Sequence, residues 1–345
     1  MRFRNVRIAA FGHALAPDRV TSLALEERLA PLYARFRLHP GRIEMMSGIR
    51  ERRFWPPGTP PSQEAARAAE AALAASGVDR DRIGCLVHAS VCRDYLEPAT
   101  ATIVHESLRL PPSCMPFDVS NACLGVANGM VLVANMIDQG QIEAGLVVAG
   151  EDGRPLIEST IAALLADEQL TKAALKEAFA SLTIGSGAAA VVLERMGAGR
   201  TDQRLVGGAV LAATQHNVLC RGGIDGRHAG PLMRTDSEAL LRAGDELAAR
   251  TFAEFLREID WRREDIDRTV THQVGTAHKR VIFETIGLAE TIDYPTLETF
   301  GNMASVSLPL SFSMAVEAGF IRHGERVMML GIGSGLNCLM LGVEW

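Results

Sequence analysis

The sequence predicts an α/β fold with largely parallel sheets, and three observations support this. Short apolar runs typical of buried strands alternate with helical patterns along the whole chain. Between Leu124 and Ile137 there is no charged residue and apolar side chains fall on every face, which indicates a helix buried deep in the protein. Only 5% of the 345 residues are aromatic, whereas alanine and glycine abound, a composition that suits close packing of helices on sheets. With 48% hydrophobic residues the chain can bury a large core, as one big domain or as two fused halves.

Apolar periodicity and capping residues place the elements that precede the buried helix. Ser22 can cap a helix that runs to Phe36, because leucines recur after it at helical spacing. Residues 48–55 form a basic turn, and a proline-rich loop follows it. The remaining elements expected in this region are a strand over 6–12, an alanine-rich helix over 62–76, a strand over 83–89, a helix over 98–108 and a strand over 115–119.

The same reasoning places the elements that follow the buried helix. Residues 154–182 are helical and amphipathic, and they have the character of an insertion. A long amphipathic helix is expected over 237–259, and another over 278–287, where Gly287 provides the stop. The strands expected in this region cover 144–150, 188–193, 205–213, 269–272, 327–330 and 338–343.

The composition argues against several classes of protein. The net charge is −6, from 41 acidic and 35 basic side chains spread along the chain, so no basic stripe argues for a nucleic-acid partner. The first residues lack the apolar core of a signal peptide, and no apolar run reaches the roughly 18 residues of a membrane span. The six cysteines show no Cys-x-x-Cys pair and no zinc-like spacing, so we expect free thiols, no metal site and a reducing cytoplasm.

Several landmarks recur, in the same order, in the second part of the chain. The string Ile-Gly-Ser-Gly occurs at 184–187 and at 332–335, an offset of 148 residues. His88 pairs with His272 at an offset of 184, and Asn121 pairs with Asn302 at an offset of 181. The offset of 148 is 36 residues smaller than the offset of 184. This difference is about the length of the helical segment that follows residue 150. The sequence therefore predicts two pseudo-symmetric halves, 1–196 with a helical insertion at about 151–182, and 197–345.

Cys123 is the candidate nucleophile. It stands where an extended run ends at a small-residue corner and the buried helix begins. Unpaired N–H groups and the macrodipole at a helix N-terminus favour thiolate over thiol, which suits a nucleophile. The alternative is a small core residue, which is what most lone cysteines are.

The repeat brings two further polar side chains towards Cys123. His272 ends a predicted strand, where α/β proteins place working residues, and Asn302 begins a helix. Their structural alternatives are a satisfied core histidine and an N-cap or turn residue. The glycine loop at 331–335 lacks the Gly-Lys-Ser/Thr of a phosphate loop, so its expected task is to present backbone N–H groups beside the thiol. Together these features predict a nucleophilic thiol whose attack forms an oxyanion.

These residues carry a family resemblance that spans essentially the whole chain. Asn-Ala-Cys at 121–123, His-Gln at 272–273, Gly-Asn at 301–302 and the terminal glycine loop resemble the ketosynthase III branch of the thiolase superfamily. More narrowly, the strings at 90–98, 219–222 and 331–338 resemble the members that join two long-chain fatty acyl-CoA thioesters in bacterial olefin synthesis. The resemblance implies a thiolase-like, five-layer αβαβα fold made of two pseudo-symmetric halves, and a homodimer.

The resemblance also implies the roles of the site residues. Cys123 would take the acyl group, and the backbone N–H groups of Cys123 and Ser334 would form the oxyanion hole. His272 and Asn302 would polarise the carbonyl of the second thioester. Glu97 would remove the α-proton, a task that suits a carboxylate made more basic by burial in a dry pocket. The alternative for Glu97, which precedes a proline, is a cap on a surface helix.

The expected function is a non-decarboxylative Claisen condensation. An acyl group passes from a fatty acyl-CoA to Cys123, and a second fatty acyl-CoA attacks it to give a 2-alkyl-3-ketoacyl product. Two long chains imply apolar channels, lined in part by residues 154–182, because each buried methylene contributes about 0.8 kcal/mol. We expect no cofactor other than the CoA thioesters that are the substrates, and downstream pathway enzymes as further partners.

Three alternatives stay open. The first is a decarboxylative 3-oxoacyl-ACP synthase III type ketosynthase, or an acyltransferase, that uses a malonyl thioester or another acceptor. Ala277 stands where chain-initiating ketosynthases of this family carry the arginine that docks acyl carrier protein, which disfavours that reading. The others are a Cys-His-Asn hydrolase, for which the papain-type string around the cysteine is absent, and a non-catalytic subunit, although no member of the Cys-His-Asn set is lost.

Overall fold

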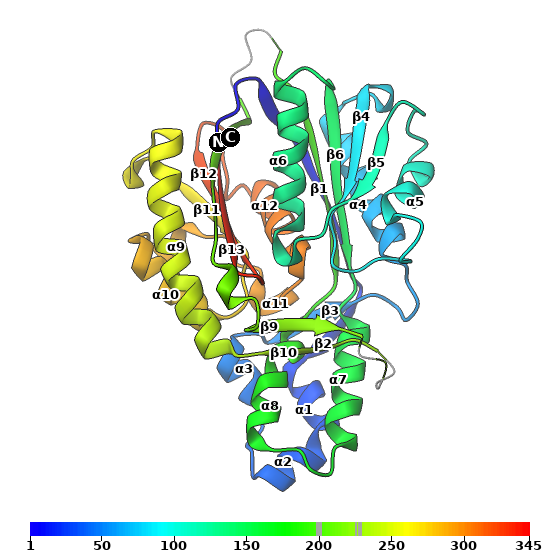
Figure 1. The fold of residues 1–345 in the computed structure, drawn as a ribbon, viewed down its shortest axis with the longest axis vertical. Helices are drawn as coiled ribbons and strands as arrows, with labels where there is room; N and C mark the ends of the chain where they lie inside the picture. Colours follow the sequence, from blue (N-terminus) through cyan, green and yellow to red (C-terminus); the bar gives the residue numbers. More distant parts are fainter. Residues whose placement is uncertain (198–201, 225, 227–229) are drawn as a thin grey trace.

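A nine-stranded sheet runs through the whole chain in the computed structural model, which describes residues 1–197, 202–224, 226 and 230–345 (Figure 1). In their order across the sheet, the strands are β11 (Arg268–Thr271), β12 (Arg326–Gly333), β13 (Asn337–Glu344), β8 (Arg204–Ala212), β1 (Val6–Leu15), β7 (Gly187–Arg195), β6 (Ala144–Glu151), β4 (Ile83–His88) and β5 (Met115–Asp118). The α/β class is confirmed.

The expectation of largely parallel pairing is wrong. Only β4–β5, β4–β6 and β11–β12 run parallel, at the two ends of the sheet. The five pairings in its middle are antiparallel. One reason is visible at β12 and β13, which are joined by the short turn 334–336 and so can only form a hairpin.

Helices cover both outer faces of the curved sheet and also fill its middle (Figure 1). The outer helices are α4 (Pro61–Ser76) and α5 (Thr100–Ser107) on one side, and α9 (Ser237–Ile259) and α10 (Thr276–Ile286) on the other. The central layer holds α6 (Gly125–Asp138) and α12 (Ser307–Glu317). The order helix, sheet, helix, sheet, helix is the five-layer αβαβα arrangement that the resemblance implied.

Alternate residues of each strand face different layers, as the pleat requires. In β6, Val147 belongs to the central core with α6, whereas Val148 packs with the alanines of α4. In β12, Met329 faces the centre and Met328 faces α9. Both strands are apolar on both faces, which is why they read as continuous apolar runs in the sequence.

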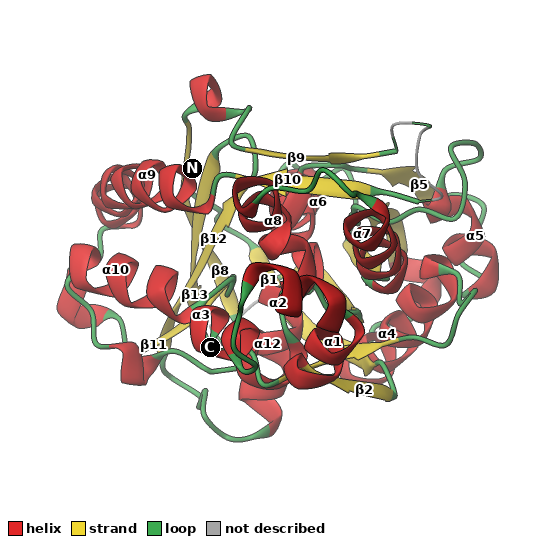
Figure 2. Cartoon of the chain, turned by 90° about the horizontal axis from the view of Figure 1, so that it is seen from below, coloured by secondary structure: helices red, strands yellow, loops and turns green. Residues whose placement is uncertain are grey.

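A cap of small helices and two β-ribbons lies below the layered body (Figures 1 and 2). Its hydrophobic core joins the segment near the N-terminus to the predicted insertion, for example Leu25 to Ile161. The cap elements are β2 (Asp18–Thr21), α1 (Ser22–Arg28), α2 (Ala30–Phe36), α3 (Arg42–Ser47), β3 (Glu51–Phe54), α7 (Arg154–Ala166), α8 (Lys172–Ala178), β9 (Cys220–Gly223) and β10 (Leu232–Thr235).

Several local expectations in the cap need correction. The helix expected over 22–36 is two helices, and its cap is Thr21, whose side chain accepts from the N–H of Ala24. Ser22 instead donates its hydroxyl to the carbonyl of Ile49. The basic turn at 48–55 contains strand β3, and the β9–β10 hairpin had no expected counterpart. Short ribbon strands of four residues carry too little periodicity to be recognised in a sequence.

The same succession of elements occurs in both parts of the chain, as predicted. The residues of the two parts correspond with a shift of one residue from the pairing we expected. Tight 3-10 turns precede both central helices, at Ala122–Leu124 and at Ala304–Val306. The first residue of each turn has a positive φ, 45° at Ala122 and 48° at Ala304. Cys123 therefore corresponds to Ser305, and Asn302 corresponds to Ser120 rather than to Asn121.

The equivalent of His272 is also shifted by one residue. The N–H of Ala89 donates to Val148 across β4 and β6, and the N–H of His272 donates to Leu330 across β11 and β12. Position 89, rather than His88, is thus the equivalent of His272.

The connection between β6 and β7 spans 152–186 and contains α7 and α8, whereas the equivalent connection between β12 and β13 spans only 334–336. The helices expected in this connection are present, whereas the division of the chain into two halves, the first with an insertion, stays a prediction.

The central helix α6 is largely buried, as its lack of charge indicates, although Leu132 on its outer face is 42% exposed. Across the ranges given above, no helix combines the length and the apolar character that a membrane crossing requires.

Asn302 and Ile184 form an isolated β-bridge that ties the insertion to the corner before α12. Gly185 lies beside this bridge, and a Cβ added to it would meet the carbonyl oxygen of Phe300 at 2.0 Å.

We predict that Gly185→Ala lowers the free energy of unfolding by about 1–3 kcal/mol, because backbone has to move to admit the methyl group. Gly197→Ala is the matched control, since a Cβ there meets no atom within 4 Å, and its effect should stay within about 0.5 kcal/mol. Urea denaturation followed by circular dichroism measures both. Equal stability of the two variants would contradict the close approach at Gly185.

Candidate active site

A cavity of about 1340 Å³ lies between the layered body and the cap. Cys123, His272, Asn302 and Ser334 all border it. The insertion contributes Leu156 and other apolar side chains to the same wall, as expected. The three side chains predicted to converge thus share one cavity, although they come from separate parts of the chain.

Cys123 is held by the first of the two 3-10 turns, just before α6. That turn packs against β12 and against the turn at 304–306. Cys123 therefore does not sit on the first turn of an α-helix. Among the described residues, its own N–H is the amide that bonds its sulfur. The thiolate expectation rested on several helix N–H groups, and this arrangement does not provide them.

The predicted stabilisation of the Cys123 thiolate is wrong. Burial raises the pKa of the Cys123 thiol to about 12, and the neighbouring Cys220 and Glu151 raise this pKa further. The loss of water around the sulfur outweighs the single hydrogen bond from its own amide, which lowers the pKa. The side chain of Cys123 is consequently a neutral thiol at pH 7.

His272 follows the last residue of β11 and is 8% exposed. Burial, followed by the proximity of His278, lowers the pKa of His272 to about 4. The imidazole is therefore neutral at pH 7. Within the described ranges, neither of its ring nitrogens has a hydrogen-bond partner. A buried imidazole with two unused nitrogens is ready to exchange hydrogen bonds with a bound substrate.

Asn302 is fixed by its backbone and by its side-chain oxygen. Its N–H donates to the carbonyl of Thr183 at 2.9 Å, and its own carbonyl accepts from Gly185 at 2.9 Å. Its Oδ1 accepts from the N–H of Ala304 at 2.9 Å. Asn302 therefore lies in a β-bridge ahead of the 3-10 turn and does not begin a helix as expected. Its Nδ2 is the group left to donate to a substrate oxygen.

The turn after β12 comes close to the backbone of Cys123. A Cβ added to Gly333 would lie 3.6 Å from the Cys123 nitrogen and 3.1 Å from Cγ of Leu124. A side chain at position 333 would thus push Ser334 away from the thiol. This approach is the geometric basis for an oxyanion hole made by the N–H groups of Cys123 and Ser334, which stays a prediction.

Glu97 does not lie in the cavity of its own chain. It is exposed, in the loop between β4 and α5, and it is absent from the residues that border the cavity. We expected Glu97 to be buried in a dry pocket that raises its basicity. For a single chain this prediction is wrong. Glu97 is not a helix cap either, since α5 begins at Thr100 with Ala99 as its N-cap.

Glu151, which the sequence reasoning missed, is a carboxylate that borders the cavity, as do Asp152 and Glu238. It ends β6 and is 3% exposed. Burial raises the pKa of Glu151, against hydrogen bonds from Ser305 and from two backbone amides that lower it. The signal was available, because Glu151 directly follows a continuous apolar run and so stands at the carboxyl end of a buried strand.

Cys220 in β9 also borders the cavity, and it too was not singled out as a site residue. All six cysteines are free. In the ranges that the structure describes, no three His, Cys, Asp or Glu side chains are grouped so that they could hold a metal ion.

Two family profiles match the chain and together cover more than half of it. Residues 117–212 match 3-oxoacyl-[acyl-carrier-protein] synthase III, and residues 256–345 match the C-terminal part of the same family. Among individual proteins, an acyl-CoA:acyl-CoA alkyltransferase of Shewanella oneidensis is 41% identical over 353 residues. Another of the same name from Xanthomonas campestris is 37% identical over 345 residues, and the match spans 100% of each chain in both cases.

Solved structures of Xanthomonas campestris OleA have the same fold. The cerulenin-bound form has a TM-score of 0.94 at 37% identity and covers 100% of this chain and 98% of its own. A cysteine-to-serine variant with bound lauric acid and lauroyl-CoA has a TM-score of 0.93 and covers 99% of this chain and 100% of its own. Other structures carry a replaced cysteine or a replaced glutamate, and those two positions are 26 residues apart, as are Cys123 and Glu97 here.

We predict that iodoacetamide alkylates Cys123 at a rate that rises about tenfold per pH unit between pH 7 and 10 without levelling off. The rate follows the thiolate fraction, which stays small over this range when the pKa is near 12. Timed quenching and mass spectrometry of the Cys123 peptide measure it, with free cysteine in the same tubes as the control. A plateau near pH 8.5, the value of an unperturbed thiol, would show that the thiol is not desolvated.

Proposed function

The chain belongs to the 3-oxoacyl-[acyl-carrier-protein] synthase III family, the ketosynthase III branch of the thiolase superfamily, and we infer that it condenses two fatty acyl-CoA thioesters without decarboxylation. The observation that carries this inference is that Cys123, His272 and Asn302 border one cavity of about 1340 Å³. Sites for a single small ligand measure roughly 300–1,000 Å³. The larger volume suits two acyl chains, and the similar proteins are named acyl-CoA:acyl-CoA alkyltransferases.

The first half-reaction loads Cys123. Its sulfur attacks the thioester carbon of the first acyl-CoA, a new C–S bond forms and the C–S bond to CoA breaks. The neutral imidazole of His272 accepts the thiol proton and passes it to the sulfur of the departing CoA. In this proposal the N–H groups of Cys123 and Ser334 bind the oxyanion. Their hydrogen bonds stabilise its negative charge, which the dry cavity would otherwise disfavour.

The second half-reaction forms the carbon–carbon bond. A carboxylate removes an α-proton from the second acyl-CoA, and the enolate oxygen accepts hydrogen bonds from Nδ2 of Asn302 and from a ring N–H of His272. The α-carbon attacks the acyl group on Cys123, the C–S bond breaks, and the thiolate recovers a proton from the carboxyl group. The product is a 2-alkyl-3-ketoacyl-CoA. A cavity with little water protects the enolate and the acyl-enzyme from hydrolysis.

We propose Glu97 as the α-proton base, supplied by a second copy of the chain in a homodimer. Because Glu97 is exposed and lies outside its own cavity, it needs either such a partner or a rearranged loop to meet a substrate. The loop presents apolar surface of the kind that dimers bury, with Leu96 97% and Tyr95 62% exposed. We further expect no resident cofactor, a cytoplasmic location and downstream enzymes that consume the 3-ketoacyl product.

Myristoyl-CoA alone should be sufficient for turnover, with release of one CoA per molecule of 2-alkyl-3-ketoacyl-CoA formed and of a second CoA when that thioester is hydrolysed. Cys123→Ala should lower the rate at least about a thousandfold by removing the acylated atom. Glu97→Ala should still acylate Cys123 but condense about 100- to 10,000-fold more slowly, as expected for loss of a general base. Free CoA, intact-protein mass and the ketone derived from the product are the three measurements. A strict requirement for malonyl-CoA would overturn the inference in favour of a decarboxylating ketosynthase.

A mixed dimer can decide which chain supplies Glu97. We predict that dimers formed from a Cys123→Ala chain and a Glu97→Ala chain condense acyl-CoA, because one cavity then combines an intact thiol with the intact carboxylate of its partner. Each variant alone should be inactive in condensation. Mixed dimers isolated through two different affinity tags provide the sample. If they are as inactive as the parents, Glu97 acts within its own chain or not at all.

A further inference from the structure

Resting on the function proposed above, we propose that Glu151 is a positioning residue for the condensation step. Its carboxylate joins the loop that leads to Glu97 to the corner that carries Asn302. Both groups are assigned to a second acyl-CoA, Asn302 in the cavity of its own chain and Glu97, in the proposed homodimer, in the cavity of the partner. Its charge also acts on Cys123, which takes the first acyl group, by raising the pKa of the thiol. Removal of that charge favours ionisation of the thiol, so loss of Glu151 should slow the second half-reaction and not the first.

Three donors converge on Glu151 from two directions. Its Oε1 accepts from the N–H of Val91 at 2.9 Å, and its Oε2 accepts from the N–H of Cys92 at 3.0 Å. The hydroxyl of Ser305 donates to Oε1. Glu151 is 3% exposed and Ser305 is 1% exposed, so solvent offers no replacement for these bonds.

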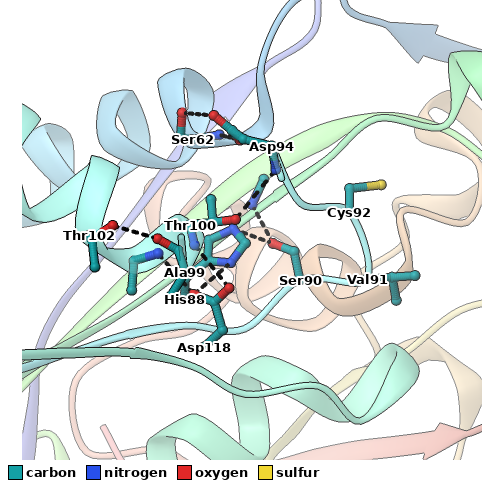
Figure 3. Close-up of polar contacts among 12 residues, drawn as sticks. Ser62, His88, Ser90, Val91, Cys92, Asp94, Ala99, Thr100, Thr102 and Asp118 are labelled. Carbon is teal, nitrogen blue, oxygen red and sulfur yellow. Dashed lines mark hydrogen bonds and ion pairs between the residues drawn. The ribbon is translucent and has the colours of Figure 1, made fainter. Parts of the chain in front are cut away.

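The loop held by Glu151 is fixed again on its far side (Figure 3). Ser90 accepts from the N–H of Gly150 at 2.8 Å, and its hydroxyl lies 3.0 Å from Nε2 of His88. The carboxylate of Asp94 accepts from the N–H of Ser62 at 2.9 Å. Residues 90–94 are thereby held at both ends, and residues 95–98, which include Glu97, project from this anchored base.

The corner held by Glu151 bears the Asn302 amide. Ser305 belongs to the turn Ala304–Val306, and the N–H of Ala304 donates to Oδ1 of Asn302. The link from Glu151 to Ser305 therefore fixes the turn whose amide orients the Asn302 side chain. One carboxylate thus sets the relative placement of the Asn302 corner and the base of the Glu97 loop.

The repeat explains why a carboxylate stands at this place. Ser305 corresponds to Cys123, and Glu151, the last residue of β6, corresponds to Gly333, the last residue of β12. In the catalytic copy, the small Gly333 lets the oxyanion turn approach the thiol. In the other copy, Glu151 bonds to the hydroxyl that replaces the thiol. In this proposal the corner at 122–124 performs the chemistry, and the corner at 304–306 holds neighbouring segments in place.

The test separates the two half-reactions. Glu151→Gln places an NH2 group where a carboxylate oxygen accepted a hydrogen bond, and Ser305→Ala removes the link to the Asn302 corner alone. We expect both variants to acylate Cys123 from myristoyl-CoA at no less than about a third of the native rate, because neither substitution raises the pKa of the thiol. Condensation from the acyl-enzyme in a single turnover should fall about 10- to 100-fold in Glu151→Gln, and less in Ser305→Ala.

Glu194→Gln provides the matched control, because Glu194 is another buried carboxylate, near the far end of β7 and paired with Arg7 and Arg82. It should leave both half-reactions unchanged. Equal losses in acylation and condensation, or native condensation in either Glu151→Gln or Ser305→Ala, would overturn the proposal. Circular dichroism reports folding, and if Glu151→Gln does not fold, the condensation rate of Ser305→Ala decides alone. A native protein that acylates but never condenses would instead refute the proposed function.

Discussion

Desolvation of the cavity is the constraint on which the rest of the site depends. It acts in opposite directions on the two titratable partners, since burial raises the pKa of the Cys123 thiol to about 12 and lowers the pKa of His272 to about 4. Both groups are therefore neutral at rest. A neutral thiol and a neutral imidazole cost less in a dry interior than a thiolate and an imidazolium. In the proposed mechanism the thiol ionises only as it attacks a thioester. In the proposed mechanism, the same exclusion of water would protect the acyl-enzyme and the enolate.

The layered fold produces this environment. Two apolar helices, α6 and α12, fill the space between the two parts of the sheet and present their preceding 3-10 turns at one end of the molecule. The cap closes that end with side chains of the insertion and of the β9–β10 ribbon. Neither the body nor the cap alone would exclude water from Cys123. The insertion is therefore part of the active site, although it follows the nucleophile by some thirty residues in the chain.

The repeat gives the two corners similar backbones and different tasks. The corner at 122–124 carries the thiol, whereas the corner at 304–306 carries a hydroxyl that is committed to Glu151. The two corners thus occupy equivalent positions in the repeat, and a few side chains distinguish them. In the corner at 304–306, Asn302 has its backbone and side-chain oxygen tied down while the amide nitrogen remains available. Strict placement of one donor is what an enolate oxygen requires.

The sequence alone determined the α/β class, the buried helix, the insertion, the repeat and the three residues that share the cavity. These follow from local apolar periodicity and from short strings, which a chain displays before it folds. Only the tertiary structure decided the remainder. The protonation of Cys123 depends on how many surrounding groups exclude water, the location of Glu97 depends on which way an exposed loop points, and the register of the repeat depends on strand pairing. Glu151 shows the same limit, because its three donors come from segments about 60 and 154 positions away in the chain. Contacts over such separations are set by packing in three dimensions, which no local pattern records.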